Sequence, residues 1–170
     1  YEQPGWFVNH QDYYDSYDRQ QPKVYLGEYA SRGKDALDNA LAEGIHLCNV
    51  ERNGDVVEMA SYAPLLSKDG YSNWSPDMIY FNNNKVRASQ SYEVQKMFSV
   101  HAGDNYVESK LDLPASLRRY VGISVVKDSK SGKTWLKVVN ALPCKLKLKL
   151  SGLSHQEIAI DARKYNVWPL

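Results

Sequence analysis

Glu28 is the residue whose type and position best suit chemistry in this sequence. It directly follows Val24–Gly27, a short and nearly continuous run of the kind found in a parallel strand that is covered on both faces. In parallel sheets with helical crossovers, catalytic groups collect at the C-terminal ends of strands, and Gly27 leaves room for a ligand to approach the backbone. A carboxylate there, among aromatic residues, is a candidate nucleophile for sugar chemistry. The alternative is a structural glutamate that pairs with a nearby arginine or lysine.

The composition is rich in tyrosine and tryptophan and nearly neutral in charge. Tyrosine and tryptophan dominate the aromatic residues, with 13 Tyr and 4 Trp against 3 Phe. Such rings suit a core near a polar cleft and also stacking on sugars, but ordinary core and surface tyrosines account for most of them. The 21 basic and 20 acidic residues leave a formal net charge of +1, so we expect no nucleic acid and no anionic membrane as a partner. No apolar run approaches the roughly 18 residues that a membrane-spanning helix needs.

Strands alternate with helices in the first part of the chain. We predict one or two short helices within Pro4–Arg19, a helix at Asp35–Arg52 with apolar residues at steps of four, four and three, and a helix at Ser89–His101. The predicted strands lie within Lys23–Ala30, Val56–Tyr62 and Met78–Phe81. A long loop, Ser67–Asp77, separates the last two of them. This alternation indicates βα units of a parallel sheet. Two strands alone do not make a stable sheet, so we expect further strands to come from sequence preceding Tyr1.

The hydrophobic period changes to two after Gly103. Apolar residues alternate in three segments, 120–127, 133–141 and 144–150, and 156–160 and 165–168 resemble two more short strands. We therefore predict an antiparallel β-sandwich, or the final strands of one, from about Asn105 to Leu170. The lysines of the Lys-Leu repeat 145–150 are interpreted as the solvated face of a half-buried strand rather than as a nucleic-acid patch.

The cysteines and histidines indicate no metal site. Cys48 and Cys144 show neither metal-type nor redox-type spacing, and we predict two free, buried thiols. The four histidines, which are His10, His46, His101 and His155, form no ligand spacing and receive no catalytic role. We expect no metal and no other cofactor.

Several blocks between Tyr1 and about Gly103 carry a resemblance to a known family. The blocks are PGWF, YYDSYDR, KVYLGEYASRG, ALAEGIHLCNVERNGDVVEMASYAPLLSKDG, WSPDMIYFNN and SYEVQKMFS. Together they resemble the C-terminal half of an α-L-arabinofuranosidase of glycoside hydrolase family fifty-one.

The resemblance implies a fold and an activity. Such enzymes have a (β/α)₈ barrel followed by a β-sandwich. Residues 1–103 would then be the C-terminal part of the barrel, with its last two strands, and residues 104–170 would be the jelly-roll-like sandwich. Such enzymes remove terminal α-L-arabinofuranosyl groups from arabinan, arabinoxylan and related polymers with retention of configuration, so the implied partner is an arabinose-containing polysaccharide or oligosaccharide.

The resemblance also implies roles for three residues. Glu28, in the GEYA block, matches the nucleophile at the end of the seventh barrel strand. Tyr1 aligns with a tyrosine pair at the end of the sixth strand, one member of which hydrogen-bonds the nucleophile. Trp74, in the loop after the eighth strand, would form a wall of the arabinose pocket or pack that loop onto the barrel. Asp77 is interpreted as structural. Trp6 and Phe7 open the loop region after the sixth strand, where we favour packing over substrate contact.

The acid/base glutamate of this family follows an asparagine at the end of the fourth strand, and no such block occurs here. Retention needs two carboxyl groups about 5 Å apart, so we expect the isolated chain to be inactive. A quarter of a barrel exposes strand edges, and we expect self-association, repacking or aggregation of the chain alone. The alternative function is a non-catalytic module that binds carbohydrate or only stabilises a neighbour.

Overall fold

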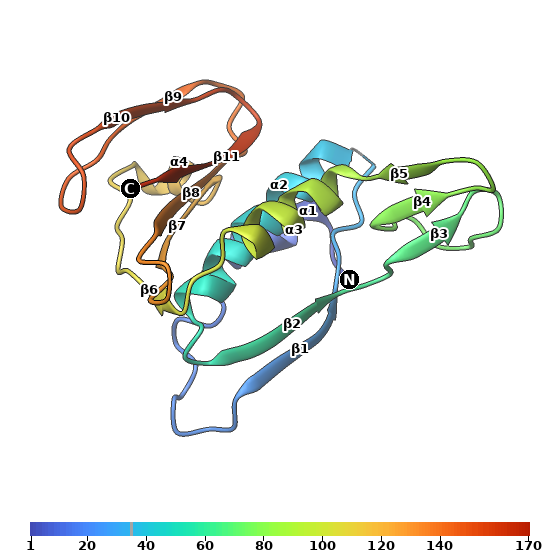
Figure 1. Cartoon of the computed structure of the whole chain (residues 1–170), viewed down its shortest axis with the longest axis horizontal. Coiled ribbons are helices and arrows are strands. Elements are labelled where there is room, and N and C mark those ends of the chain that lie inside the picture. Colours follow the sequence, from blue (N-terminus) through green and yellow to red (C-terminus); the bar gives the residue numbers. More distant parts are fainter. Residues whose placement is uncertain (35) are drawn as a thin grey trace.

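Two packed helices separate the β-rich regions of the chain (Figure 1). The computed structural model describes residues 1–34 and 36–170. Helix α2 spans Ala36–Arg52 and helix α3 spans Gln90–Val100. Asp35, the predicted first residue of α2, lies outside the described residues. Ser89 caps α3, because its side-chain oxygen accepts a hydrogen bond from the backbone N–H of Tyr92 at 3.1 Å.

Strand β1 (Val24–Tyr29) and strand β2 (Val57–Tyr62) form a parallel pair joined by α2, as the alternation of strands and helices predicts. Leu26 lies opposite Ala60, and Tyr29 opposite Tyr62. The N-terminal segment runs beside the end of β1, where Glu2 forms a parallel bridge to Ser31. The N-terminus therefore lies near the C-terminal ends of both strands (Figure 1).

Helix α1 spans only Pro4–Asn9, so the prediction of helix up to Arg19 is wrong in its extent. Residues 10–17 form successive turns, in which backbone N–H groups bond to carbonyls three residues earlier rather than four. Aspartates occur throughout this stretch, and their side chains compete with the helix for backbone groups.

A small sheet of three strands follows β2. Its strands are β3 (Leu66–Lys68), β4 (Ile79–Phe81) and β5 (Val86–Ala88). The predicted loop Ser67–Asp77 thus contains most of β3, which pairs in parallel with β4. The sequence did not reveal β5, because all three of its residues are exposed and show no apolar alternation.

The C-terminal region is antiparallel, as its alternating pattern predicts. A four-stranded sheet has the order β11-β8-β7-β6, and β9 pairs with β10. The bounds are β6 Asn105–Tyr106, α4 Ala115–Arg118, β7 Val121–Lys127, β8 Thr134–Asn140, β9 Leu146–Lys149, β10 Glu157–Ile160 and β11 Lys164–Pro169. Side chains from β7, β8 and β10 meet in one hydrophobic cluster.

Both cysteines are free thiols, but only one is buried. Cys48 lies in the core, whereas Cys144 is exposed, so the prediction of two buried thiols is wrong for Cys144. The reason is that β9 begins at Leu146, and Cys144 lies in the preceding bend, where its carbonyl accepts a hydrogen bond from Asn140.

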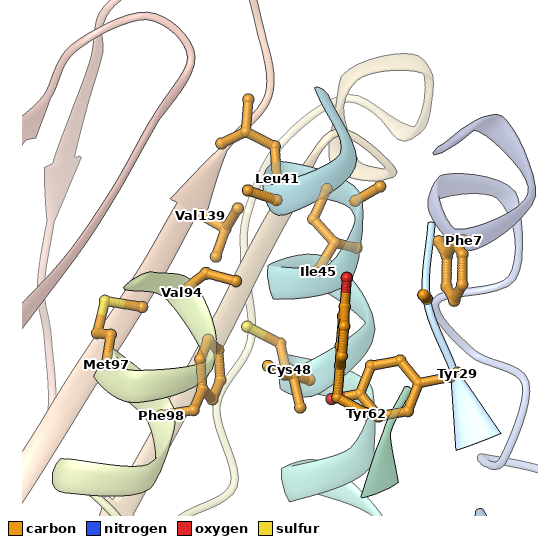
Figure 2. Close-up of a cluster of buried hydrophobic side chains, with 14 of the residues drawn as sticks. Phe7, Tyr29, Leu41, Ile45, Cys48, Tyr62, Val94, Met97, Phe98 and Val139 are labelled. Carbon is orange, nitrogen blue, oxygen red and sulfur yellow. The ribbon is translucent and has the colours of Figure 1, made fainter. Parts of the chain in front are cut away.

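Helix α2 packs on three sides. Figure 2 shows Leu41, Ile45 and Cys48 among side chains of α3 and β8, with aromatic rings of α1, β1 and β2 beside them. A Cβ at Gly44 would lie 3.0 Å from side-chain atoms of both Val94 and Val139, so glycine permits the close approach of α3 and β8.

A buried ion pair joins α2 to the C-terminal sheet. Lys137 of β8 is fully buried and contacts the Glu51 carboxylate, which also accepts a hydrogen bond from the Ser124 hydroxyl at 2.5 Å. The Lys137 ammonium also lies 5.0 Å from the centroid of the Phe98 ring. Removal of either charge would leave the other buried and uncompensated.

We expect Lys137→Met to lower the free energy of unfolding by about 3–5 kcal/mol, because Glu51 would lose its cation while the buried volume stays nearly constant. Urea denaturation monitored by circular dichroism measures this change. The matched control is Lys145→Met, since Lys145 pairs with Asp161 on the surface and such pairs contribute about 0–1 kcal/mol. Equal losses of unfolding free energy in the two variants would show that the buried Lys137–Glu51 pair contributes no more than a surface pair.

Candidate active site

Glu28 lies at the C-terminal end of β1, where its side chain is exposed and receives a hydrogen bond from Tyr1. The Tyr1 hydroxyl donates to Glu28 Oε2 at 2.5 Å, a distance typical of a strong bond to a charged acceptor. In the part of the chain that the structure describes, no arginine or lysine forms an ion pair with Glu28. The structural alternative raised by the sequence, a closed ion pair, is therefore absent from the described residues.

The Trp74 ring packs against the ring of Tyr1, the residue that binds Glu28. The two rings meet edge to face, with centroids 5.2 Å apart and an interplanar angle of 66°. Both residues remain more than one-third exposed. The structure thus brings together all three residues that the sequence singled out, although Trp74 is far from the other two along the chain.

Arg32 is a fourth member of this group, and sequence reasoning placed it only in a loop. Its guanidinium lies 5.3 Å from the Trp74 ring centroid and 5.9 Å from the Tyr1 ring centroid. Its Nη2 also donates to the Tyr1 carbonyl at 3.2 Å. A cation in the loop directly after the Glu28 strand was the available signal. We call Tyr1, Glu28, Arg32 and Trp74 the Glu28 cluster.

The hydrogen bond stabilises the protonated form of Tyr1. The Glu28 carboxylate raises the pKa of Tyr1 to about 12, first through this bond and then with help from partial desolvation, while Arg32 opposes the rise. The phenol therefore keeps its proton near neutral pH and acts as a donor. Such a donor can orient a carboxylate for attack and reduce its freedom to rotate.

The structure places the remaining sequence candidates in packing contacts or hydrogen bonds within the protein. Asp77 is buried, and its backbone N–H donates to the Tyr80 hydroxyl at 2.8 Å. Phe7 belongs to the hydrophobic core, and Trp6 stacks on His10 with ring centroids 4.4 Å apart. Among the described residues, no group of three or more His, Cys, Asp or Glu side chains could hold a metal ion. No helix in the same residues is long and apolar enough to cross a membrane.

A model of the alpha-L-arabinofuranosidase C-terminal domain family matches residues 12–167. This chain belongs to that family. The assignment places it in glycoside hydrolase family fifty-one, as the sequence blocks predicted.

Curated relatives of the domain are much longer than this chain. An extracellular exo-α-L-arabinofuranosidase of Streptomyces chartreusis is 48% identical over 128 residues, which cover 73% of this chain and 15% of the relative. Alpha-L-arabinofuranosidase 1 of Arabidopsis thaliana is 41% identical over 102 residues, which cover 58% of this chain and 15% of the relative. The chain thus spans about 15% of the length of these relatives.

Solved structures share the fold of the domain. An arabinose-bound family fifty-one α-L-arabinofuranosidase aligns with a TM-score of 0.79 and 25% identity, covering 100% of this chain and 33% of the other. An arabinose complex of the Thermotoga maritima enzyme aligns with a TM-score of 0.60 and 12% identity, covering 95% of this chain and 44% of the other, and shows the fold alone. The mixed α/β arrangement with several small sheets therefore matches the C-terminal region of this family.

Two ionisable side chains on α2 of this arabinofuranosidase domain, Glu43 and His46, are buried. Burial raises the pKa of Glu43 to about 7, although nearby polar groups, led by the Ser31 backbone N–H, favour its charged form. Burial lowers the pKa of His46 to about 4, and neither of its ring nitrogens has a hydrogen-bond partner among the described residues. His46 instead lies among the rings of Phe7, Tyr14 and Tyr29.

We expect the stability difference between the parent and a Glu43→Gln variant to depend on pH. Because the folded state holds the Glu43 proton up to about pH 7, while the unfolded state releases it near 4.5, ionisation destabilises the fold as pH rises between these values. The parent should lose about 3 kcal/mol relative to the variant over this range. Urea denaturation at half-unit pH steps measures the difference. A difference that is flat between these pH values would show that Glu43 ionises normally.

Proposed function

We propose that this chain supplies the nucleophile-bearing end of a retaining α-L-arabinofuranosidase. The observation that carries the proposal is the Tyr1–Glu28 hydrogen bond in a family member, at the end of a parallel strand and with Trp74 beside it. Glu28 is the nucleophile, Tyr1 orients its carboxylate, and Trp74 forms a wall of the sugar site.

In this proposal, residues 1–103 complete a (β/α)₈ barrel, in which β1 and β2 are the seventh and eighth strands, and residues 104–170 contribute the β-sandwich. Supporting this, β1 and β2 are parallel and joined by a helix. Tyr25 and Met59, one on each strand, are also more than half exposed in the chain alone. Further strands and side chains from the rest of the enzyme would cover them. Until they do, the exposed strand edges favour self-association.

Glu28 attacks the anomeric carbon of a terminal α-L-arabinofuranosyl group, and the bond to the leaving oxygen breaks as that oxygen takes a proton from the acid/base carboxylic acid. Water then hydrolyses the glycosyl–Glu28 ester with the same group acting as base. The acid/base carboxylate lies on a part of the enzyme outside this chain, so the chain alone is inactive. The substrate class is arabinan- or arabinoxylan-type polysaccharide, in keeping with the arabinofuranosidase activities named for the relatives.

Glu28→Gln in the enzyme that contains this chain should lower kcat by on the order of 10⁴-fold or more, because glutamine cannot form the glycosyl ester. Release of 4-nitrophenol from its α-L-arabinofuranoside measures the rate. Glu157→Gln is the matched control, since Glu157 is an exposed residue of β10 and its loss should leave the rate unchanged. A near-normal rate for Glu28→Gln would overturn the proposal and favour a non-catalytic module.

A further inference from the structure

The loop Ser31–Gly33 connects the end of β1 to the start of the α2 region and carries Arg32. Arg32 itself is exposed, so burial of its own side chain does not fix its position. Its position over Tyr1 and Trp74 therefore depends on how firmly the loop backbone is held. Two buried polar side chains of α2, Asn39 and Glu43, bind that backbone.

Asn39 makes three hydrogen bonds to the loop. Its Oδ1 accepts from the Gly33 backbone N–H at 2.6 Å and from the Ser31 hydroxyl at 2.9 Å. Its Nδ2 donates to the Gly33 carbonyl at 3.0 Å. The side chain thus satisfies both backbone groups of Gly33, and Asn39 is only 2% exposed.

Glu43 lies one helical turn after Asn39, on the same face of α2. Its Oε1 accepts from the Ser31 backbone N–H at 2.9 Å, and the residue is fully buried. A carboxyl group at a buried helix position is costly unless its hydrogen bonds repay the desolvation. The bond to the loop supplies a hydrogen-bond donor for one of the two carboxyl oxygens of Glu43, Oε1.

The opposite side of the loop is equally constrained. A Cβ on Gly33 would lie 2.7 Å from Pro4 Cγ and 2.9 Å from Asn39 Oδ1, so the loop is wedged between α1 and α2. The Arg32 backbone N–H donates to the Glu2 carbonyl at 2.8 Å. All three residues of the loop are therefore held through their backbones, and the Arg32 side chain projects from a fixed base.

We propose that Asn39 and Glu43 are positioning residues, which hold the Ser31–Gly33 loop so that Arg32 fixes Tyr1 and Trp74 beside Glu28. This inference rests on the proposed function. Neither residue touches the sugar. They act through Arg32, which contacts both aromatic rings and binds the Tyr1 carbonyl.

A double-mutant cycle in the intact enzyme tests the proposal, because residues that act through one another show non-additive effects. Asn39→Ala should lower kcat by about 10-fold with a smaller change in KM, since the nucleophile loses its orienting tyrosine more than the enzyme loses sugar contacts. In an Arg32→Ala background, Asn39→Ala should cost less than about 2-fold. The same fold-loss in both backgrounds would overturn the proposal.

Asn49→Ala is the matched control on the same helix. Asn49 is fully buried and its Nδ2 donates to Asp15 at 3.4 Å, far from the loop along α2. Its loss should lower the melting temperature without any coupling to Arg32. Coupling as strong as that of Asn39 would show that general loosening of the helix, not the hold on the loop, moves the rate.

Conservative variants test the role of Glu43 and provide a substitute if Asn39→Ala folds poorly. Glu43→Gln keeps an acceptor for the Ser31 N–H and should retain most of the kcat that Glu43→Ala loses; equal losses would contradict the role. Asn39→Asp keeps Oδ1 but loses the bond to the Gly33 carbonyl, and it replaces Asn39→Ala in the cycle if that variant does not fold.

Glu28→Gln measured in the same series separates the two proposals. An active Glu28→Gln enzyme would contradict the proposed function itself. An inactive Glu28→Gln enzyme, together with an additive Asn39–Arg32 cycle, would remove only the positioning role.

Discussion

Burial of α2 on nearly every side is the constraint on which the rest of the structure depends. Every residue from Asn39 to Asn49 is buried, and the helix contacts α1, α3 and the C-terminal sheet. This buried stretch presents no solvent face, so its polar side chains can hydrogen-bond only within the protein, as Asn39 and Glu43 do. Glu51, at the C-terminal end of α2, pairs with Lys137 of the C-terminal four-stranded sheet, whereas Asn39 and Glu43 hydrogen-bond the loop beside Glu28. One helix thereby connects the C-terminal sheet to the candidate active site.

Hydrophobic periodicity predicted the elements that bury a regular face. Helix α2, strands β1 and β2, and the five longer C-terminal strands lie within a few residues of their predicted positions. The errors fall where periodicity carries no information. Aspartate-rich turns replace most of the helix predicted up to Arg19, β5 has no buried face, and the bend before β9 exposes Cys144. The division at residue 103 and the barrel strands remain predictions, because the rest of a barrel would have to come from outside this chain.

The candidate site was partly predictable for a different reason. Glu28 follows a strand, and resemblance to a family added Tyr1 and Trp74; the structure then brought these three into contact. Arg32 was not predicted because a loop lacks the sequence periodicity from which the direction of a side chain could be inferred. Arg32 joins the Glu28 cluster only through tertiary contacts. Asn39 also escaped notice, since an asparagine within a helix is ordinarily a weak helix former rather than a sign of a buried partner.

The most direct measurement of the central claim is mass spectrometry of a trapped glycosyl-enzyme. The intact enzyme is incubated with an activated arabinofuranoside whose glycosyl ester hydrolyses slowly, and the protein is then digested and mapped. The account predicts a mass increase of one glycosyl group on the peptide that contains Glu28, lost when the ester is cleaved. A label on another carboxylate, or turnover with inversion and no label, would contradict it.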